Sequence, residues 1–219
     1  MANRKWPLLA LIALILVPSS AAKRPLTVEE LLAGLQGWLD GTRSLQGGFE
    51  QSLLSGALGS EIDESGRLYI ERPGRMRWDY LEPERKSALV DGDRTWLYLE
   101  DEAELMLGRL GDQGELFPRL LTGEGRLSES FDAQILSLPR RQGRGVYQLQ
   151  LVPKGGDEAF ENVVLLLRPP EFSIEAAEVL DATGNRITYR FTGMERNGDL
   201  PEGLFRLDPP EGTLVMGEH

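Results

Sequence analysis

The sequence predicts a mainly β protein with helical segments, in which one large curved antiparallel sheet carries helices on one side. Three observations support this prediction. An amphipathic helical pattern stands near the N-terminus, hydrophobic alternation with a period of two begins at Phe49, and explicit turn motifs separate the alternating runs. A chain of 219 residues is long enough for one sizeable core.

The N-terminal segment predicts a signal peptide. Arg4 and Lys5 precede an unbroken apolar run over residues 8–17, and Ser20-Ala21-Ala22 places small residues at the cleavage positions. The alternative is a transmembrane anchor, but ten residues are about half of the ~20 needed to cross a bilayer. We therefore expect cleavage after Ala22 and one mature domain over residues 23–219. Since no cysteine stands at the cleavage site, the predicted location of a bacterial product is the periplasm, as a soluble protein.

The predicted helix covers roughly residues 28–41. Thr27 and Glu30 form a capping-box pattern, in which each side chain can bond the other residue's backbone N–H. The apolar residues that follow recur at helical spacing; they are Leu31, Leu32, Leu35, Trp38 and Leu39. Gly41 stands where the helix is expected to end. This apolar stripe either docks on a core or takes part in function.

Most of the chain after the helix is predicted to form strands. Alternating apolar positions include Leu68/Ile70, Met76/Trp78/Tyr80, Trp96/Tyr98, Tyr147/Leu149/Leu151 and Ile187/Tyr189/Phe191. Turns are predicted at Pro73-Gly74, Asp91-Gly92 and 181–185. Residues 163–167 are apolar throughout, which favours a strand covered on both faces. Consecutive hairpins of this kind predict an antiparallel meander.

The central stretch, residues 102–136, breaks this alternation. Residues 115–121 (Glu-Leu-Phe-Pro-Arg-Leu-Leu) favour a short helix or a lid segment, and residues 128–131 favour another helical turn. The predicted order is therefore helix, β-meander, helical insert and second β-meander.

Composition excludes several kinds of chemistry. The chain has no cysteine, and its single histidine, His219, is the last residue. Lys and Arg total 24 against 35 Asp and Glu, a net charge of −11, which argues against nucleic acid as a partner and against lasting adhesion to an anionic membrane. Asp91 and Asp93 lack the further ligands of a calcium loop, so a hairpin turn is the better interpretation. We expect no metal, no cofactor and no enzyme activity.

One basic residue stands out among the strands. Arg72 lies at a predicted strand end, immediately before the Pro73-Gly74 turn, and the next strand turns Met76, Trp78 and Tyr80 to one face. An arginine at the mouth of an apolar surface can donate several hydrogen bonds to carbonyls of a facing helix or loop. The alternative is an ordinary surface arginine.

Several blocks of the sequence, in this order and spacing, resemble the LolA family of periplasmic outer-membrane lipoprotein carrier proteins. The blocks are 49–51, 66–78, Pro83, 90–98, 117–121, 200–207 and 209–215. The resemblance covers nearly the whole mature chain and is weakest over 100–136. It implies an incomplete antiparallel β-barrel closed over by a helical lid.

The same resemblance implies a function and its partners. Members of the family carry triacylated lipoproteins from an inner-membrane ABC transporter to an outer-membrane acceptor that is itself a lipoprotein of similar fold. The arginine matching Arg72 bonds lid carbonyls in the closed state and is needed for release of the cargo. We expect a monomer; the alternative function is a related periplasmic lipid-binding or lipid-sensing module of the same fold.

An apolar concave face could shelter acyl chains, which cost about 0.8 kcal/mol per CH2 to expose to water. The candidate lining residues come from the helix, two strands and the predicted lid; they are Leu35, Leu39, Leu68, Ile70, Met76, Trp78, Leu120 and Leu121. Each of them is otherwise a plain core residue.

Overall fold

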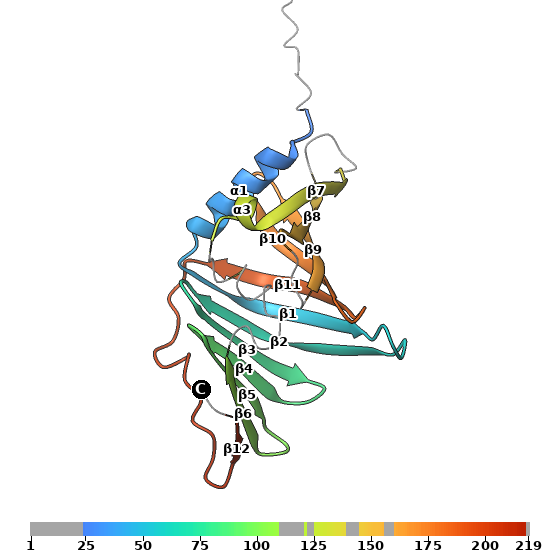
Figure 1. Cartoon of the computed structure of the whole chain (residues 1–219). Coiled ribbons are helices and arrows are strands. Elements are labelled where there is room, and N and C mark those ends of the chain that lie inside the picture. Colours follow the sequence, from blue (N-terminus) through green and yellow to red (C-terminus); the bar gives the residue numbers. More distant parts are fainter. Residues whose placement is uncertain (1–23, 110–120, 122–124, 139–144, 156–159, 218–219) are drawn as a thin grey trace, which may run out of the picture.

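The computed structural model describes residues 24–109, 121, 125–138, 145–155 and 160–217 (Figure 1). The predicted signal peptide, residues 1–22, lies outside the described residues, and so does segment 115–121 apart from Leu121. Two helices and one sheet of twelve strands make up the regular structure of the described part.

Both helices are short. Helix α1 comprises Val28–Asp40 and helix α3 comprises Leu127–Ser130. The strands, in chain order, are β1 (Ser44–Leu54), β2 (Glu61–Glu71), β3 (Arg75–Glu82), β4 (Lys86–Asp91), β5 (Arg94–Leu99), β6 (Glu104–Arg109), β7 (Phe131–Ser137), β8 (Tyr147–Pro153), β9 (Phe160–Arg168), β10 (Ser173–Asp181), β11 (Arg186–Arg196) and β12 (Leu214–Met216).

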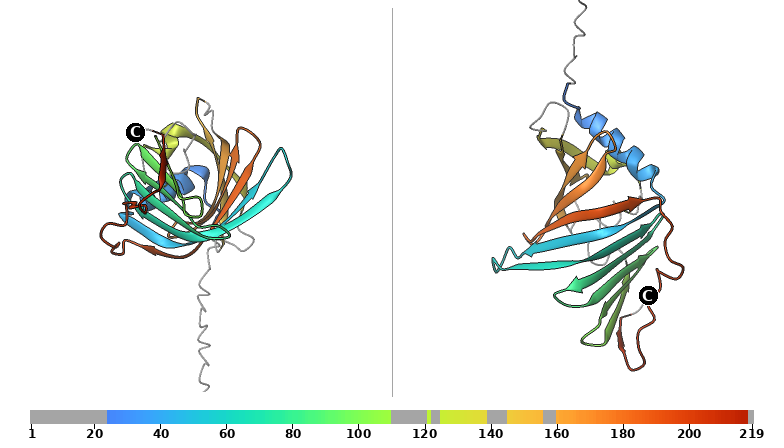
Figure 2. Two further views of the ribbon diagram at one scale, coloured as in Figure 1. Left: turned by 90° about the horizontal axis from the view of Figure 1, so that it is seen from below. Right: turned by 180° about the vertical axis from the view of Figure 1, so that it is seen from behind.

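The sheet is open and strongly curved. Its strand order is β12-β6-β5-β4-β3-β2-β1-β11-β10-β9-β8-β7, so β12 and β7 are its two edges. Neighbouring strands are antiparallel except β12 and β6, which are parallel. Figure 2 shows the sheet curling into an incomplete barrel, with α1 lying across one end. The predicted half-open antiparallel β-barrel with helices is therefore confirmed.

Helix α1 has the cap that its sequence predicts. The Thr27 hydroxyl accepts from the Glu30 N–H at 3.3 Å, and the Glu30 carboxylate accepts from the Thr27 N–H at 2.9 Å. Arg24 donates to the same carboxylate, and this bond holds the pKa of Glu30 below its usual value. The helix ends one residue before the predicted boundary, with Gly41 as its C-cap.

A polar corner fixes the C-terminal end of α1 to the end of β11. The guanidinium of Arg196 donates to the Trp38 carbonyl at 3.1 Å and to the Thr42 hydroxyl at 2.8 Å. The side chain of Asn197 accepts from the Arg43 N–H at 2.7 Å and donates to the Gly41 carbonyl at 3.0 Å. These bonds satisfy carbonyls that the helix end leaves without intrahelical partners.

The local predictions along the strands hold. Two-residue or longer turns join β2 to β3, β4 to β5 and β10 to β11, as predicted. The first two turns touch, since the Gly92 N–H donates to the Gly74 carbonyl at 2.9 Å. In β9, Val163, Val164, Leu165 and Leu167 are buried, as expected for a strand covered on both faces. The predicted helical turn at 128–131 is α3, with Phe131 already in β7.

Strand β1 begins earlier than its alternation suggests. Alternation was recognised from Phe49, but β1 starts at Ser44. The reason is the Gly47-Gly48 pair, which interrupts the pattern at a bulge opposite β11. A Cβ atom at Gly47 would lie 2.3 Å from the Met194 sulfur and 2.9 Å from the Thr192 carbonyl oxygen.

A second, smaller core lies on the convex face of the sheet and was not predicted. Leu89 and Leu105 are buried there, outside the concave cluster, and Leu89 lies directly opposite Trp96 on β5. Residues 197–213, which we call the C-terminal strap, run along this face to β12 (Figure 1). The Arg77 guanidinium donates to the strap carbonyls of Leu204 at 2.7 Å and Arg206 at 3.2 Å.

Arg77 is the clamp that holds the strap, so its loss should loosen this face. Arg77→Met leaves the carbonyls of Leu204 and Arg206 without this donor, and the Asp79 carboxylate keeps only its bond from the Ser87 hydroxyl. We expect the free energy of unfolding to fall by about 1–3 kcal/mol, measured by urea denaturation. The matched control is Arg67→Met, an exposed arginine on β2, which should change stability by less than about 0.5 kcal/mol. Equal losses in the two variants would contradict the clamp.

Candidate functional site

The concave face of the sheet is lined by aromatic rings that meet across the curve. Phe49 on β1 packs edge-on against Trp78 and Tyr80 on β3, with ring centroids 4.7 and 5.0 Å apart. Trp78 also lies 5.2 Å from Tyr189 on β11. Strands β3 and β11 are separated by β2 and β1, a span of roughly 14 Å at ordinary strand spacing. The rings can meet only because the sheet curls around them.

Helix α1 closes this face with its apolar stripe. Leu35 is fully buried and Leu39 is 3% exposed, and both belong to the same cluster as the inward-facing residues of β2 and β3. The candidate residues that the structure brings together in this one cluster are Leu35, Leu39, Leu68, Ile70, Met76, Trp78 and Leu121. Leu120 lies outside the described residues. The predicted lining is thus a single packed surface.

Sequence reasoning missed the other half of the cluster. Strands β8 and β9 contribute Tyr147, Leu149, Leu151, Leu165 and Leu167, all 2% exposed or less. The alternation in β8 and the continuous apolar run in β9 predict strands, but neither pattern reveals that these residues face α1. The Tyr147 hydroxyl accepts from the Leu26 N–H at 2.9 Å, just before the helix, and so fixes the start of α1 over these strands.

Hollows among the described residues lie mainly on the face of the sheet opposite the rings. Three hollows of about 460, 630 and 530 Å³ lie over β1, β2, β10 and β11. All three share Glu50, and two share Arg190, its cross-strand partner.

A row of polar side chains crosses the concave face on the far side of the rings from α1. The Glu64 carboxylate accepts from the Lys86 ammonium at 2.5 Å and from the Gln51 amide at 2.8 Å. The Gln51 carbonyl accepts from the Tyr80 hydroxyl at 3.0 Å. Burial raises the pKa of Tyr80 and of nearby Tyr189 well above the usual value, so both phenols stay protonated. We call Gln51, Glu64, Tyr80 and Lys86 the polar row.

Arg72 occupies the β2–β3 turn, beside the C-terminal end of α1. Its backbone N–H donates to the Arg43 carbonyl at 2.8 Å, and its side chain is half-buried. Burial lowers the pKa of the Arg72 guanidinium, and the carboxylate of Asp40, the last residue of α1, opposes that shift. A cation in this place is also favoured by the partial negative charge of a helix C-terminus.

Neither a metal centre nor a membrane span is found in the described ranges. Among these residues no group of three or more Asp, Glu or His could hold a metal ion. Asp91 and Asp93 belong to the β4–β5 hairpin, where Asp93 lies 3.3 Å from the Arg109 guanidinium. No helix of the described part is both long and apolar enough to cross a bilayer.

Fold and site together define an open β-barrel protein with an apolar concave face covered by a helix. Comparison with known families identifies which one. The family model described as "Outer membrane lipoprotein carrier protein LolA" matches residues 40–208. The chain therefore belongs to the LolA family, as its sequence blocks suggested, and the family name assigns it to lipoprotein transport and localisation.

Individual relatives agree along almost their whole length. An outer-membrane lipoprotein carrier protein of Alkalilimnicola ehrlichii is 32% identical over 213 residues, 95% of this chain and 94% of the relative. One of Chromohalobacter salexigens is 30% identical over 217 residues, 98% and 97% of the two chains. Among solved structures, an uncharacterized conserved protein from Thermus thermophilus superposes with a TM-score of 0.55 at 14% identity, covering 86% of this chain and 97% of that one. That likeness concerns the fold alone.

Proposed function

We propose that this protein is a periplasmic, non-enzymatic carrier of triacylated lipoproteins. It receives them from an inner-membrane lipoprotein-releasing ABC transporter and delivers them to a LolB-like outer-membrane acceptor. The observation that carries the proposal is the apolar cluster between α1 and the concave face, in a chain that belongs to the lipoprotein carrier family. The cluster offers acyl chains a site away from water.

The energetic reason for such a carrier is the cost of exposing acyl chains. At ~0.8 kcal/mol per CH2, a chain of about sixteen carbons costs on the order of 12 kcal/mol to hold in water. Three chains on one lipoprotein cannot cross an aqueous compartment unassisted. A concave apolar surface removes this cost without any catalytic group.

The contacts that hold α1 against the sheet are mainly apolar, which lowers the cost of replacing them with cargo. Along its length the helix is packed by apolar side chains such as Leu31, Leu35 and Leu39, which acyl chains can replace in kind. At its C-terminal end it is fixed by several directional hydrogen bonds of Arg196 and Asn197, whereas its start is held by one bond, from the Leu26 N–H to the Tyr147 hydroxyl, which must break when the helix moves. We infer that α1 moves about this corner when the apolar interface opens to take up cargo.

A release assay tests the function. Purified residues 23–219 are added to spheroplasts whose lipoproteins carry a label, and the supernatant is fractionated by size. The expected result is label in soluble complexes at one lipoprotein for each carrier. If a known carrier releases label in parallel and this chain releases none, lipoprotein carriage is wrong and a lipid-binding or lipid-sensing role takes its place.

Arg72 is proposed as the residue that favours the closed state and hence release of the cargo. Its position beside Asp40 joins the β2–β3 turn to the end of α1. Arg72→Leu should leave folding near normal but trap cargo, slowing transfer to the acceptor by about tenfold or more, equivalent to ~1.4 kcal/mol. Transfer is followed by the appearance of labelled lipoprotein on acceptor. Arg67→Leu, at an exposed position of the preceding strand β2, is the control, and transfer at the wild-type rate in Arg72→Leu would refute the assignment.

Leu39 is proposed to contact the cargo from the helix. Leu39→Glu places a carboxylate in the apolar cluster, where a charge is strongly disfavoured, so capture of labelled lipoprotein should fall by about tenfold or more. Ala33→Glu adds the same charge at an exposed position of α1 and should capture cargo normally. Circular dichroism is recorded for both variants. Unchanged capture by a folded Leu39→Glu protein would remove Leu39 from the cargo site.

A further inference from the structure

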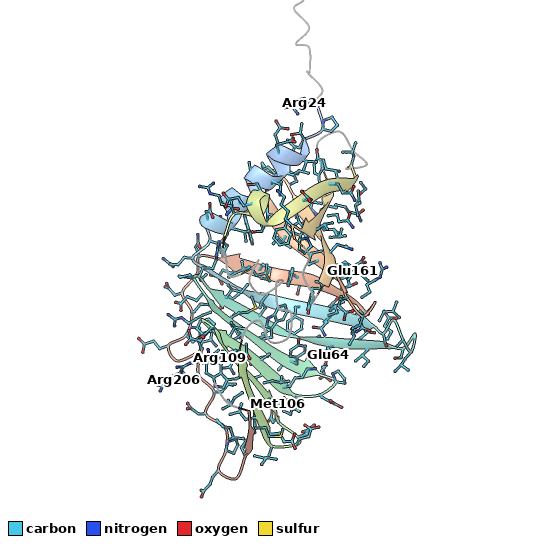
Figure 3. The ribbon with its side chains drawn as sticks, in the orientation of Figure 1. Arg24, Glu64, Met106, Arg109, Glu161 and Arg206 are labelled. Atoms are coloured by element: carbon cyan, nitrogen blue, oxygen red, sulfur yellow. The ribbon has the colours of Figure 1, made fainter. Side chains whose placement is uncertain are left out.

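The polar row stands at a boundary along the strands. Gln51 lies directly opposite both Glu64 and Tyr189, and Tyr80 lies directly opposite Lys86. Nearer to α1, the same face carries the rings of Phe49 and Trp78 and the side chain of Leu68. Figure 3 shows Glu64 on β2, well away from α1. The lining therefore changes from apolar to hydrogen-bonding within a few residues of each strand.

Stability alone does not account for a charge pair in this position. The Glu64 side chain is 10% exposed and the Lys86 side chain 25%, so both charges are largely removed from water. Replacing such pairs by apolar residues of similar volume is often neutral or stabilising. Glu64 and Lys86 also lie on strands β2 and β4, with β3 between them, so no backbone pairing depends on their contact. A ligand that needs polar partners at this place would account for the buried charge pair.

The polar row has more donor hydrogens than its own acceptors take up. The ammonium of Lys86 carries three N–H groups, of which Glu64 accepts one, and it sits 4.5 Å from the centre of the Tyr80 ring. The Gln51 amide donates one of its two N–H groups to Glu64, and the single O–H of Tyr80 is donated to the Gln51 carbonyl, so that Tyr80 holds this amide in place. A charged donor in a partly desolvated site makes the stronger hydrogen bonds.

The geometry points to a subsite for the carbonyl groups at the heads of the acyl chains, and we propose that the polar row binds them. This inference rests on the proposed carrier function. Every acyl chain ends in an ester or amide carbonyl, an acceptor that costs about 1–3 kcal/mol when it is buried without a donor. With the carbonyls at the Lys86 ammonium and the Gln51 amide, the chains run toward α1 over the rings. The polypeptide part of the cargo then leaves on the side of the β1–β2 hairpin tip.

The test compares two synthetic lipopeptides that differ only at the linkage. One carries ester-linked chains and the other carries ether-linked chains of equal length, which lack the carbonyl oxygens. We expect the wild-type protein to bind the ester-linked peptide about tenfold more tightly, as measured by titration calorimetry. The affinity for the ether-linked peptide reports the apolar face alone.

The variants separate recognition from a structural role. The double variant E64Q/K86M removes both charges, so that no carboxylate is left buried without a partner, and Y80F removes one hydroxyl while keeping the ion pair. In the double variant the preference for the ester should fall below about twofold, with the ether-linked affinity unchanged. Y80F should reduce the preference by a smaller factor. K154M, on a lysine at the end of β8, is the control and should keep the full preference.

Each result decides one question. Equal wild-type affinity for the two peptides overturns the subsite and leaves the carrier function standing. Binding of neither peptide overturns the carrier function and the subsite with it. Loss of affinity for both peptides to the same degree in the double variant and in Y80F assigns the row a structural role only. A preference retained in both variants places carbonyl recognition elsewhere.

Discussion

The packing of Phe49 against Trp78 and Tyr80 is the contact on which the rest of the structure depends. It requires a tight curl of the sheet, and Gly66, directly opposite Phe49, makes that curl possible. A Cβ atom at Gly66 would lie 1.9 Å from the Asp79 carbonyl oxygen and 2.9 Å from the Phe49 ring. The Phe49 ring thus packs directly on the backbone of Gly66, which has no side chain, at a bulge between β2 and β3. Without this close approach the rings of β3 and β11 would not meet, and α1 would have no concave surface to cover.

Strand β3 divides the molecule into two regions of different character. Its inward residues, Met76 and Trp78, belong to a cluster held by non-directional apolar contacts. Its outward residues, Arg77 and Asp79, belong to a hydrogen-bonded clamp on the C-terminal strap. Apolar contacts can be exchanged for contacts with another apolar molecule at little net cost, whereas buried directional bonds cannot. The same strand therefore supports an interior held by exchangeable apolar contacts and an outer wall held by directional hydrogen bonds.

Local features could be predicted from the sequence, while features that depend on register could not. The capping box of α1, the Asp91-Gly92 turn and the strand at 163–167 are set by neighbouring residues, and all were predicted correctly. The path of the C-terminal strap and the parallel pairing of β12 with β6 are not predicted by the sequence, because both depend on where segments distant in the chain meet. The turn position of Arg72 was foreseen, but its neighbour Asp40 was not, since only the tertiary fold brings the end of α1 to that turn.

One member of the polar row leaves a signal in the sequence, whereas its ion pair does not. Gln51 stands two residues after the inward Phe49, so the alternation itself places a polar side chain on the apolar face. Lys86 is 22 residues from its partner Glu64, and only the register of β2, β3 and β4 brings that pair together. Apolar contact scales with chain length but gives no orientation, whereas a few buried polar groups fix how a ligand enters its site. A protein that binds acyl chains and then releases them gains more from orienting the chains than from binding them tightly. A short polar row beside an apolar surface of exchangeable contacts meets that requirement.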